Sequence, residues 1–140
     1  MDVTKQLMAP AITARVSDIY LRPDRNGYAV IWRRGSGLET VAALSLAEGQ
    51  QVINALKYLA QLDVSETRRP QSGMWRYGPQ LNVRVATVGD YLERESSVLR
   101  ILYPLTKEPH LFFPNQFVLP CDLARQRGLI AFAGPMGPGK

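Results

Sequence analysis

The stretch SDIYLRPDRNGYAVIWR, residues 17–33, contains two short β-rich segments separated by a turn. In the first segment Ile19 and Leu21 alternate with polar or charged neighbours, a pattern typical of a half-buried strand. Asn26 and Gly27 supply turn chemistry, and the segment YAVIWR that follows them is rich in residues that favour strands. We therefore expect a β-hairpin over this stretch.

The residues after the hairpin predict a third strand and then a helix. Glycines around Ser36 indicate a second turn, and ETVAAL, residues 39–44, has the composition of a strand. Ser45 followed three residues later by Glu48 is a capping-box signature. Apolar residues then recur at helical spacing over residues 46–62, so we expect an amphipathic helix there.

The rest of the first hundred residues completes an α+β pattern. Residues 74–88 and 95–103 predict three further strands, with a Gly-Pro turn between the first two. Residues 2–13 predict a short amphipathic helix that Pro10 ends or kinks. The order helix, three strands, helix, three strands predicts an α+β domain built around an antiparallel sheet.

The last quarter of the chain differs in composition. Residues 104–127 contain regularly spaced prolines and read as a linker, which ends in a short helix near CDLARQ, residues 121–126. GLIAFA, residues 128–133, is expected to be a buried strand that begins a new unit.

Length and charge narrow the class of protein without defining its function. The chain has 140 residues and a net charge of +5, which permits an anionic partner but also fits a mildly basic surface. Its single cysteine, Cys121, excludes an internal disulfide and fits a reducing cytosolic setting. No apolar stretch is long enough to span a bilayer, and the first twenty residues do not resemble a secretion signal.

The residues from Gly134 to Lys140 match the phosphate-loop pattern G-x-x-x-x-G-K up to its lysine. Glycine suits such a loop because backbone amides must close around phosphate oxygens, and the lysine places a cation on the β- and γ-phosphates. The hydroxyl residue that binds Mg²⁺ in this motif would be residue 141. The alternative interpretation is a glycine- and proline-rich tail.

Several motifs together resemble the secretion and pilus ATPases, the family of type II secretion, type IV pilus and competence motors. VSDIYLRP resembles the family's SDIH-x-x-P, IWRRGSG takes the place of its R-x-R-x-D-G hairpin, and LAQLDVSETRRPQSG resembles its MANLDIAERRLPQDG. VRVATV, ESSVLRIL and GLIAFAGPMGPGK are similar to its RVSTLP, GEKVVLRLL and GLILVTGPTGSGK, the last being the Walker A loop. The motifs occur in the family's order over residues 17–140.

This resemblance implies a domain organisation and an activity. Residues 1–103 would form a PAS-like N-terminal domain, residues 104–127 a linker, and residues 128–140 the first strand and truncated phosphate loop of a RecA-like ATPase domain. Family members assemble as hexameric rings and hydrolyse ATP to drive assembly of a pilus or pseudopilus, here for DNA uptake. The remaining ATPase core is expected after residue 140, so we expect the 140-residue chain alone to lack ATPase activity.

The resemblance also implies ligands, partners and a location. ATP and Mg²⁺ are the expected cofactors of the full-length protein, and neither is expected to bind tightly to this chain. The expected partners are further copies in a homohexamer and an inner-membrane assembly protein of the pilus or competence system, with only indirect nucleic-acid contact. The location would be cytoplasmic, peripheral at the inner face of the cell membrane.

The resemblance identifies candidate site residues. The cofactor-binding candidates are Gly134, Pro135, Met136, Gly137, Pro138, Gly139 and Lys140, and no metal ligand is assigned. Arg34 and Arg68 match arginines of the family's N-terminal domain and are the candidates for stabilising charge on the transferring phosphate. The alternatives are a surface ion pair for Arg34 and a loop salt bridge between Glu66 and Arg68. In a regular strand Arg33 faces away from Arg34, so only one of these two neighbours can serve.

Some positions depart from the family's pattern and leave other functions open. Tyr20 replaces the histidine of SDIH, Trp32 replaces the first arginine of R-x-R, and Ala55 replaces a helix arginine. A non-enzymatic nucleic-acid-binding module is an alternative, given the basic balance and the mixture of cations and aromatics in RRPQSGMWRY. A protein-docking module is a further alternative.

Overall fold

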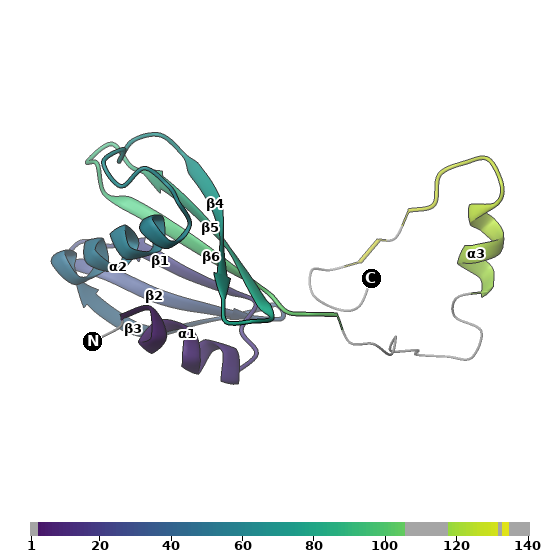
Figure 1. Ribbon diagram of the computed structural model, residues 1–140, viewed down its shortest axis with the longest axis horizontal. Helices are drawn as coiled ribbons and strands as arrows, with labels where there is room; N and C mark the ends of the chain where they lie inside the picture. The colour runs from purple at the N-terminus through teal and green to yellow at the C-terminus, as the bar shows by residue number, and fades with distance from the viewer. Residues whose placement is uncertain (1–2, 106–117, 132, 135–140) are drawn as a thin grey trace. The chain divides into compact units, whose positions relative to one another are not determined.

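The computed structural model of the chain describes residues 3–105, 118–131, 133 and 134. The chain divides into two compact units, Met1–Pro104 and Leu105–Lys140. The first unit contains a six-stranded sheet and two helices, α1 and α2, and the described part of the second contains one short helix, α3 (Figure 1).

The sheet of the first unit is antiparallel throughout. Its strands are β1 (Asp18–Pro23), β2 (Gly27–Arg34), β3 (Gly37–Ser45), β4 (Gln71–Tyr77), β5 (Leu81–Gly89) and β6 (Glu95–Leu102), in the spatial order β3-β2-β1-β6-β5-β4. The sheet therefore consists of two three-stranded meanders, joined where β1 pairs with β6. The α+β class and the two groups of three strands predicted from the sequence are confirmed.

The turn between β1 and β2 forms at the expected place, and a side chain stabilises it. Asp24 Oδ1 accepts hydrogen bonds from the backbone N–H groups of Asn26 at 2.9 Å and of Gly27 at 2.8 Å. This is the local side-chain bonding that makes aspartate common in turns. The turn leaves Ile19 opposite Trp32 and Leu21 opposite Val30, so the apolar residues of both strands lie on one face.

The two helices of the first unit cover that apolar face (Figure 1). Helix α2, Leu46–Leu59, begins at the predicted capping box, where Ser45 Oγ accepts from Glu48 N and a Glu48 carboxylate oxygen accepts from Ser45 N at 2.8 Å. Helix α1, Val3–Thr13, continues through Pro10 to Thr13, so Pro10 does not end it.

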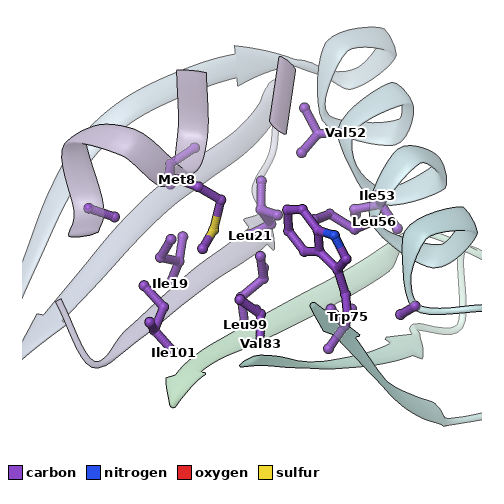
Figure 2. Close-up of a cluster of buried hydrophobic side chains, with 14 of the residues drawn as sticks. Met8, Ile19, Leu21, Val52, Ile53, Leu56, Trp75, Val83, Leu99 and Ile101 are labelled. Atoms are coloured by element: carbon purple, nitrogen blue, oxygen red, sulfur yellow. The ribbon is translucent and has the colours of Figure 1, made fainter. Parts of the chain in front are cut away.

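A single hydrophobic core lies between the helices and the sheet (Figure 2). Met8 from α1 and Val52, Ile53 and Leu56 from α2 point toward the strand residues of the same cluster. The sheet contributes side chains from five strands: Ile19, Leu21, Tyr28, Val30, Trp75, Val83, Val85, Leu99 and Ile101. The opposite face of each strand, by the alternation of side chains, points away from this core.

The second unit differs from its prediction at one point. The short helix expected near residues 121–126 is present as α3, Val118–Ala124. The strand expected over residues 128–133 is not found among the described residues there, and Leu129 is 92% exposed. The described part of this unit contains no strand with which the segment could pair its backbone hydrogen bonds.

Within the described part of the chain, no helix is both long enough and apolar enough to cross a membrane.

Candidate functional site

Arg34 lies at the end of β2, beside a turn that requires glycine. Gly35 has a φ of 56°, in the left-handed region that side chains with a Cβ rarely adopt. The Arg34 guanidinium pairs with the Glu39 carboxylate on β3 at 3.2 Å, and the two side chains are 57% and 58% exposed. The surface ion pair of Arg34, which the sequence left open as an alternative, is therefore present, and both of its side chains are exposed to solvent.

Arg33 and Arg34 occupy opposite faces of the sheet, as the alternation predicted. Arg34 shares a hollow with Trp32 and Glu39, on the helix-covered side. Arg33 borders a different hollow on the uncovered side, where its guanidinium carbon lies 5.7 Å from the centre of the Tyr20 ring. The two neighbouring arginines thus cannot reach the same ligand from one copy of the sheet.

Arg68 lies in the loop between α2 and β4, which a buried lysine anchors. Lys57 Nζ donates to the carbonyl oxygens of Glu66 at 2.7 Å and Val64 at 3.3 Å. It also pairs with the Glu95 carboxylate on β6 at 2.8 Å, and the two side chains are 0% and 1% exposed. Gln50 donates to the other Glu95 oxygen at 3.2 Å. A single buried ion pair therefore connects α2, β6 and this loop.

Within the loop, Glu66 and Arg68 do not form the predicted salt bridge between their side chains. Glu66 Oε1 accepts instead from the backbone N–H groups of Arg68 at 2.8 Å and Arg69 at 3.1 Å. These backbone hydrogen bonds lower the pKa of the Glu66 carboxyl. The Arg68 guanidinium pairs with Glu93 in the β5–β6 turn, and the hydrogen bond that it donates to that carboxylate raises the pKa of the arginine.

The two candidate arginines lie at opposite ends of the sheet. Arg33, next to Arg34, begins a row of directly opposed residues across the sheet. The row continues through Asp18 and Arg100 to Arg84, near the start of β5. Arg68 pairs with the turn that follows the other end of β5, at Gly89. Residues 84–89 alone span about 17 Å along the strand. The first unit therefore does not bring Arg34 and Arg68 together around one ligand.

The chain leaves the first unit at the Arg34 end. Strand β6 ends at Leu102, and the Tyr103 hydroxyl donates to the Val16 carbonyl oxygen at 2.8 Å. Val16 lies two residues before Asp18, the first residue of β1. The polypeptide that continues toward the phosphate-loop sequence therefore starts from the end of the sheet that carries Arg34.

Most of the phosphate-loop sequence cannot be described structurally. Gly134 is the last described residue, and the candidates Pro135, Met136, Gly137, Pro138, Gly139 and Lys140 lie outside the described residues. In the parts of the chain that the structure describes, no group of three or more histidine, cysteine or acidic side chains could bind a metal ion.

The sequence predictions missed two features of this unit. The buried pair of Lys57 and Glu95 has one indication in the sequence, since Lys57 follows Ile53 by four residues on the apolar side of the helix. The second feature is a set of strand arginines without carboxylate partners among the described residues, namely Arg22, Arg33, Arg76 and Arg84. Arg84 lies opposite Arg100 and Met74, so neither residue directly across from it is acidic.

Comparison with known proteins identifies relatives along the whole chain. Competence protein ComGA of Streptococcus pneumoniae is 32% identical over 142 residues, which cover 99% of this chain and 45% of that protein. Competence protein ComGA of Bacillus subtilis is 26% identical, and the match covers 99% of this chain and 40% of that protein. The type IV pilus assembly ATPase PilB of Acinetobacter baylyi is 29% identical, with 96% of this chain and 25% of that protein covered.

The chain thus spans less than half the length of these relatives. The family resemblance stated from the motifs is confirmed by a family model that covers the chain from its first residue to its last. Since that model, described as Type II/IV secretion system protein, matches residues 1–140, the chain belongs to the family of secretion, pilus and competence ATPases.

Proposed function

We propose that this chain is the N-terminal portion of a hexameric ATPase that powers assembly of a pilus or pseudopilus for DNA uptake. The observation that carries the proposal is the family match over residues 1–140, which includes the G-x-x-x-x-G-K sequence at Gly134–Lys140. The competence function named for two of the relatives supports DNA uptake over protein export.

The proposal includes ligands, partners and a location. ATP would bind to the full-length protein at residues 134–140, together with Mg²⁺. The first unit would be the PAS-like domain, followed by the linker at residues 104–127 and the start of a RecA-like domain at residues 128–140. The partners would be further copies of the protein and an inner-membrane assembly protein, at the cytoplasmic face of the membrane.

Of the two candidate arginines, Arg34 is the first that we assign to the nucleotide, because it matches the arginine of the family's R-x-R-x-D-G hairpin. Its pair with Glu39 is more than half exposed, and such surface pairs contribute only about 0–1 kcal/mol. Phosphate oxygens, which match the planar guanidinium fork, could replace the Glu39 carboxylate at little cost.

Phosphate release from ATP by the full-length protein tests these assignments. We expect hydrolysis by the full-length protein, its loss in Lys140→Ala, and none by the 140-residue chain. Arg34→Gln should lower kcat by about a thousandfold if the arginine stabilises transition-state charge. Arg25→Gln, an exposed arginine in the β1–β2 turn, is the matched control that should retain full activity.

Two results would contradict the proposal. Undiminished hydrolysis by Lys140→Ala would exclude the phosphate loop as the nucleotide site. If Arg34→Gln and Arg25→Gln had the same activity, Arg34 would be only a surface ion-pair partner.

A further inference from the structure

The face of the sheet opposite the helices, here called the open face, is not covered by any described element of the first unit. Both α1 and α2 pack on the other side (Figure 1). Alternation along the strands places Tyr20, Ile31 and Val98 on the open face, while their strand neighbours Ile19, Val30 and Leu99 are in the core. The described part of the first unit therefore leaves the open face as a broad, uncovered β-surface.

Arginines cross this face in a band, defined by Arg33, Arg100, Arg84 and Arg76. Arg33 lies opposite Asp18, Asp18 opposite Arg100, and Arg100 opposite Arg84. Arg76 extends the band onto β4 one row further along, opposite Asn82. Because neighbouring strands are about 4.8 Å apart, the first three arginines span about 14 Å across the sheet.

The band is poorly neutralised. Asp18 is the one acidic residue among the described strand residues that face this side, and it is 3% exposed. Its carboxylate already accepts from Arg100 Nε at 2.7 Å and from the Ser17 hydroxyl at 3.0 Å. Arg33 and Arg84 have no carboxylate partner in the described part of the chain, and the buried Arg33 Nε has no hydrogen-bond acceptor there. The open face thus presents strong and largely unpaired positive charge.

An apolar row with an aromatic residue runs beside the band. Ile31 lies opposite Tyr20, Tyr20 opposite Val98, and Val98 opposite Ala86, and all four side chains are half-buried. Tyr20 and Arg33 together border a hollow of about 290 Å³ on this face. Arg22, which also borders the hollow, adds a cation on the far side of the apolar row.

We propose that the open face binds single-stranded nucleic acid, with the nucleic-acid backbone along the arginine band and the bases against the apolar row that contains Tyr20. Guanidinium groups match phosphate oxygens in a bidentate manner, and a single strand leaves its bases free to stack on aromatic and apolar side chains. An exposed β-sheet with cations beside an aromatic ring is a surface on which other proteins bind single strands. This activity is independent of the proposed nucleotide site.

The first test measures binding of a fluorescein-labelled oligo(dT) of 15 nucleotides to the 140-residue chain by fluorescence anisotropy, over a range of salt concentrations. Four arginine–phosphate contacts predict a slope of log K against log salt of about −3, since each contact to a single strand contributes about −0.7. Arg84→Gln should weaken binding and reduce the slope by about 0.7. Lys5→Gln on α1, on the helix side, removes the same charge and should change neither quantity.

The second test separates base stacking from charge. Tyr20→Leu leaves the net charge unchanged and should weaken oligo(dT) binding about 5- to 150-fold while leaving the salt slope unchanged. Circular dichroism and the thermal midpoint of each variant establish that the fold is retained.

Three outcomes would overturn the proposal. The first is equal loss of affinity in Lys5→Gln and Arg84→Gln, which would indicate a diffuse charge effect. The second is unchanged binding by Tyr20→Leu, which would exclude bases from the apolar row. The third is competition by a polyglutamate peptide as effective as that by unlabelled oligo(dT), which would assign the face to an acidic protein partner.

Discussion

The buried pair of Lys57 and Glu95 yields the sharpest prediction about this fold. Replacing Lys57 by Met keeps a side chain of similar length but removes the charge and three donated hydrogen bonds. The Glu95 carboxylate, 1% exposed, then has no cation, and two loop carbonyl oxygens lose the hydrogen bond from Lys57. Breaking a buried pair on one side costs about 3–5 kcal/mol. This is a large part of the roughly 5–15 kcal/mol by which a domain is stable.

The free energy of unfolding of Lys57→Met is measured by urea titration, with the fluorescence of Trp75 in the core reporting on unfolding. With a slope of about 1–3 kcal/mol per molar urea, the midpoint should fall by at least about 1 M. The urea midpoint of Lys57→Arg, which keeps the charge, should fall by less than that of Lys57→Met. The double variant Lys57→Met with Glu95→Met should recover much of the loss, because no unpaired buried charge remains.

Limited trypsin digestion under native conditions reports on the loop separately from global unfolding. Arg68 is the accessible cleavage site, because the bond after Arg69 precedes Pro70 and resists trypsin. Lys57→Met should accelerate cleavage after Arg68 more than cleavage after Arg25, the matched site in the β1–β2 turn. A midpoint within about 0.2 M of the wild type, together with unchanged cleavage after Arg68, would refute the anchoring role of the buried pair.

Three further changes test the packing of α2 and the acid sensitivity of the loop. Gly49→Ala would place a Cβ 2.1 Å from the Tyr28 ring and should lower stability by about 1–3 kcal/mol in a urea titration, whereas Gln51→Ala on the exposed side of the same helix should have little effect. Ser45→Ala removes the helix cap and should cost about 1 kcal/mol by thermal unfolding, and an unchanged midpoint would contradict the capping role. The pKa values of Asp63 and Glu66 are lowered in the folded state by hydrogen bonds, chiefly from Ser65 to Asp63 and from the Arg68 backbone to Glu66. Their stabilising contribution is therefore present above the ordinary carboxyl pKa values and is lost as the pH falls through the lowered ones. The thermal midpoint should decrease from pH 6 to pH 3, and this decrease should be smaller in Glu66→Gln than in the wild type. An equal decrease in the two proteins would contradict the contribution of Glu66.

Local sequence patterns predicted most of the first unit because its elements depend on local chemistry. The capping box at Ser45 and Glu48 acts over three residues, and the two meanders follow from alternation interrupted by turn residues. Such signals need no knowledge of distant parts of the chain. Pro10 does not end α1 as one of the two expected outcomes had it, because the helix continues to Thr13 and packs against the core.

Features that depend on distant partners could not be predicted in the same way. Lys57 and Glu95 are 38 residues apart in the sequence. Only the packing of α2 against β6 brings them together and offsets the desolvation cost of burying the lysine. The salt bridge between Glu66 and Arg68, which the sequence offered as an alternative, does not form, because backbone amides two and three residues away compete for the same carboxylate oxygen. The expected strand at residues 128–133 lacks a neighbouring strand among the described residues, and periodicity alone cannot supply one.

The position of the arginines on the two faces of the sheet makes the two proposals independent of each other. Arg34 lies on the helix-covered side beside Glu39, whereas Arg33 lies on the open face beside Tyr20. A ligand that binds Arg34 at the end of the sheet therefore does not require the open face. A nucleic-acid strand bound to the open face likewise does not require Arg34. If the nucleotide were instead bound by the open-face arginines, Arg33→Gln would impair both ATP hydrolysis and oligo(dT) binding. Loss of hydrolysis with Arg34→Gln alone and of oligo(dT) binding with Arg33→Gln alone is the pattern that two separate sites require.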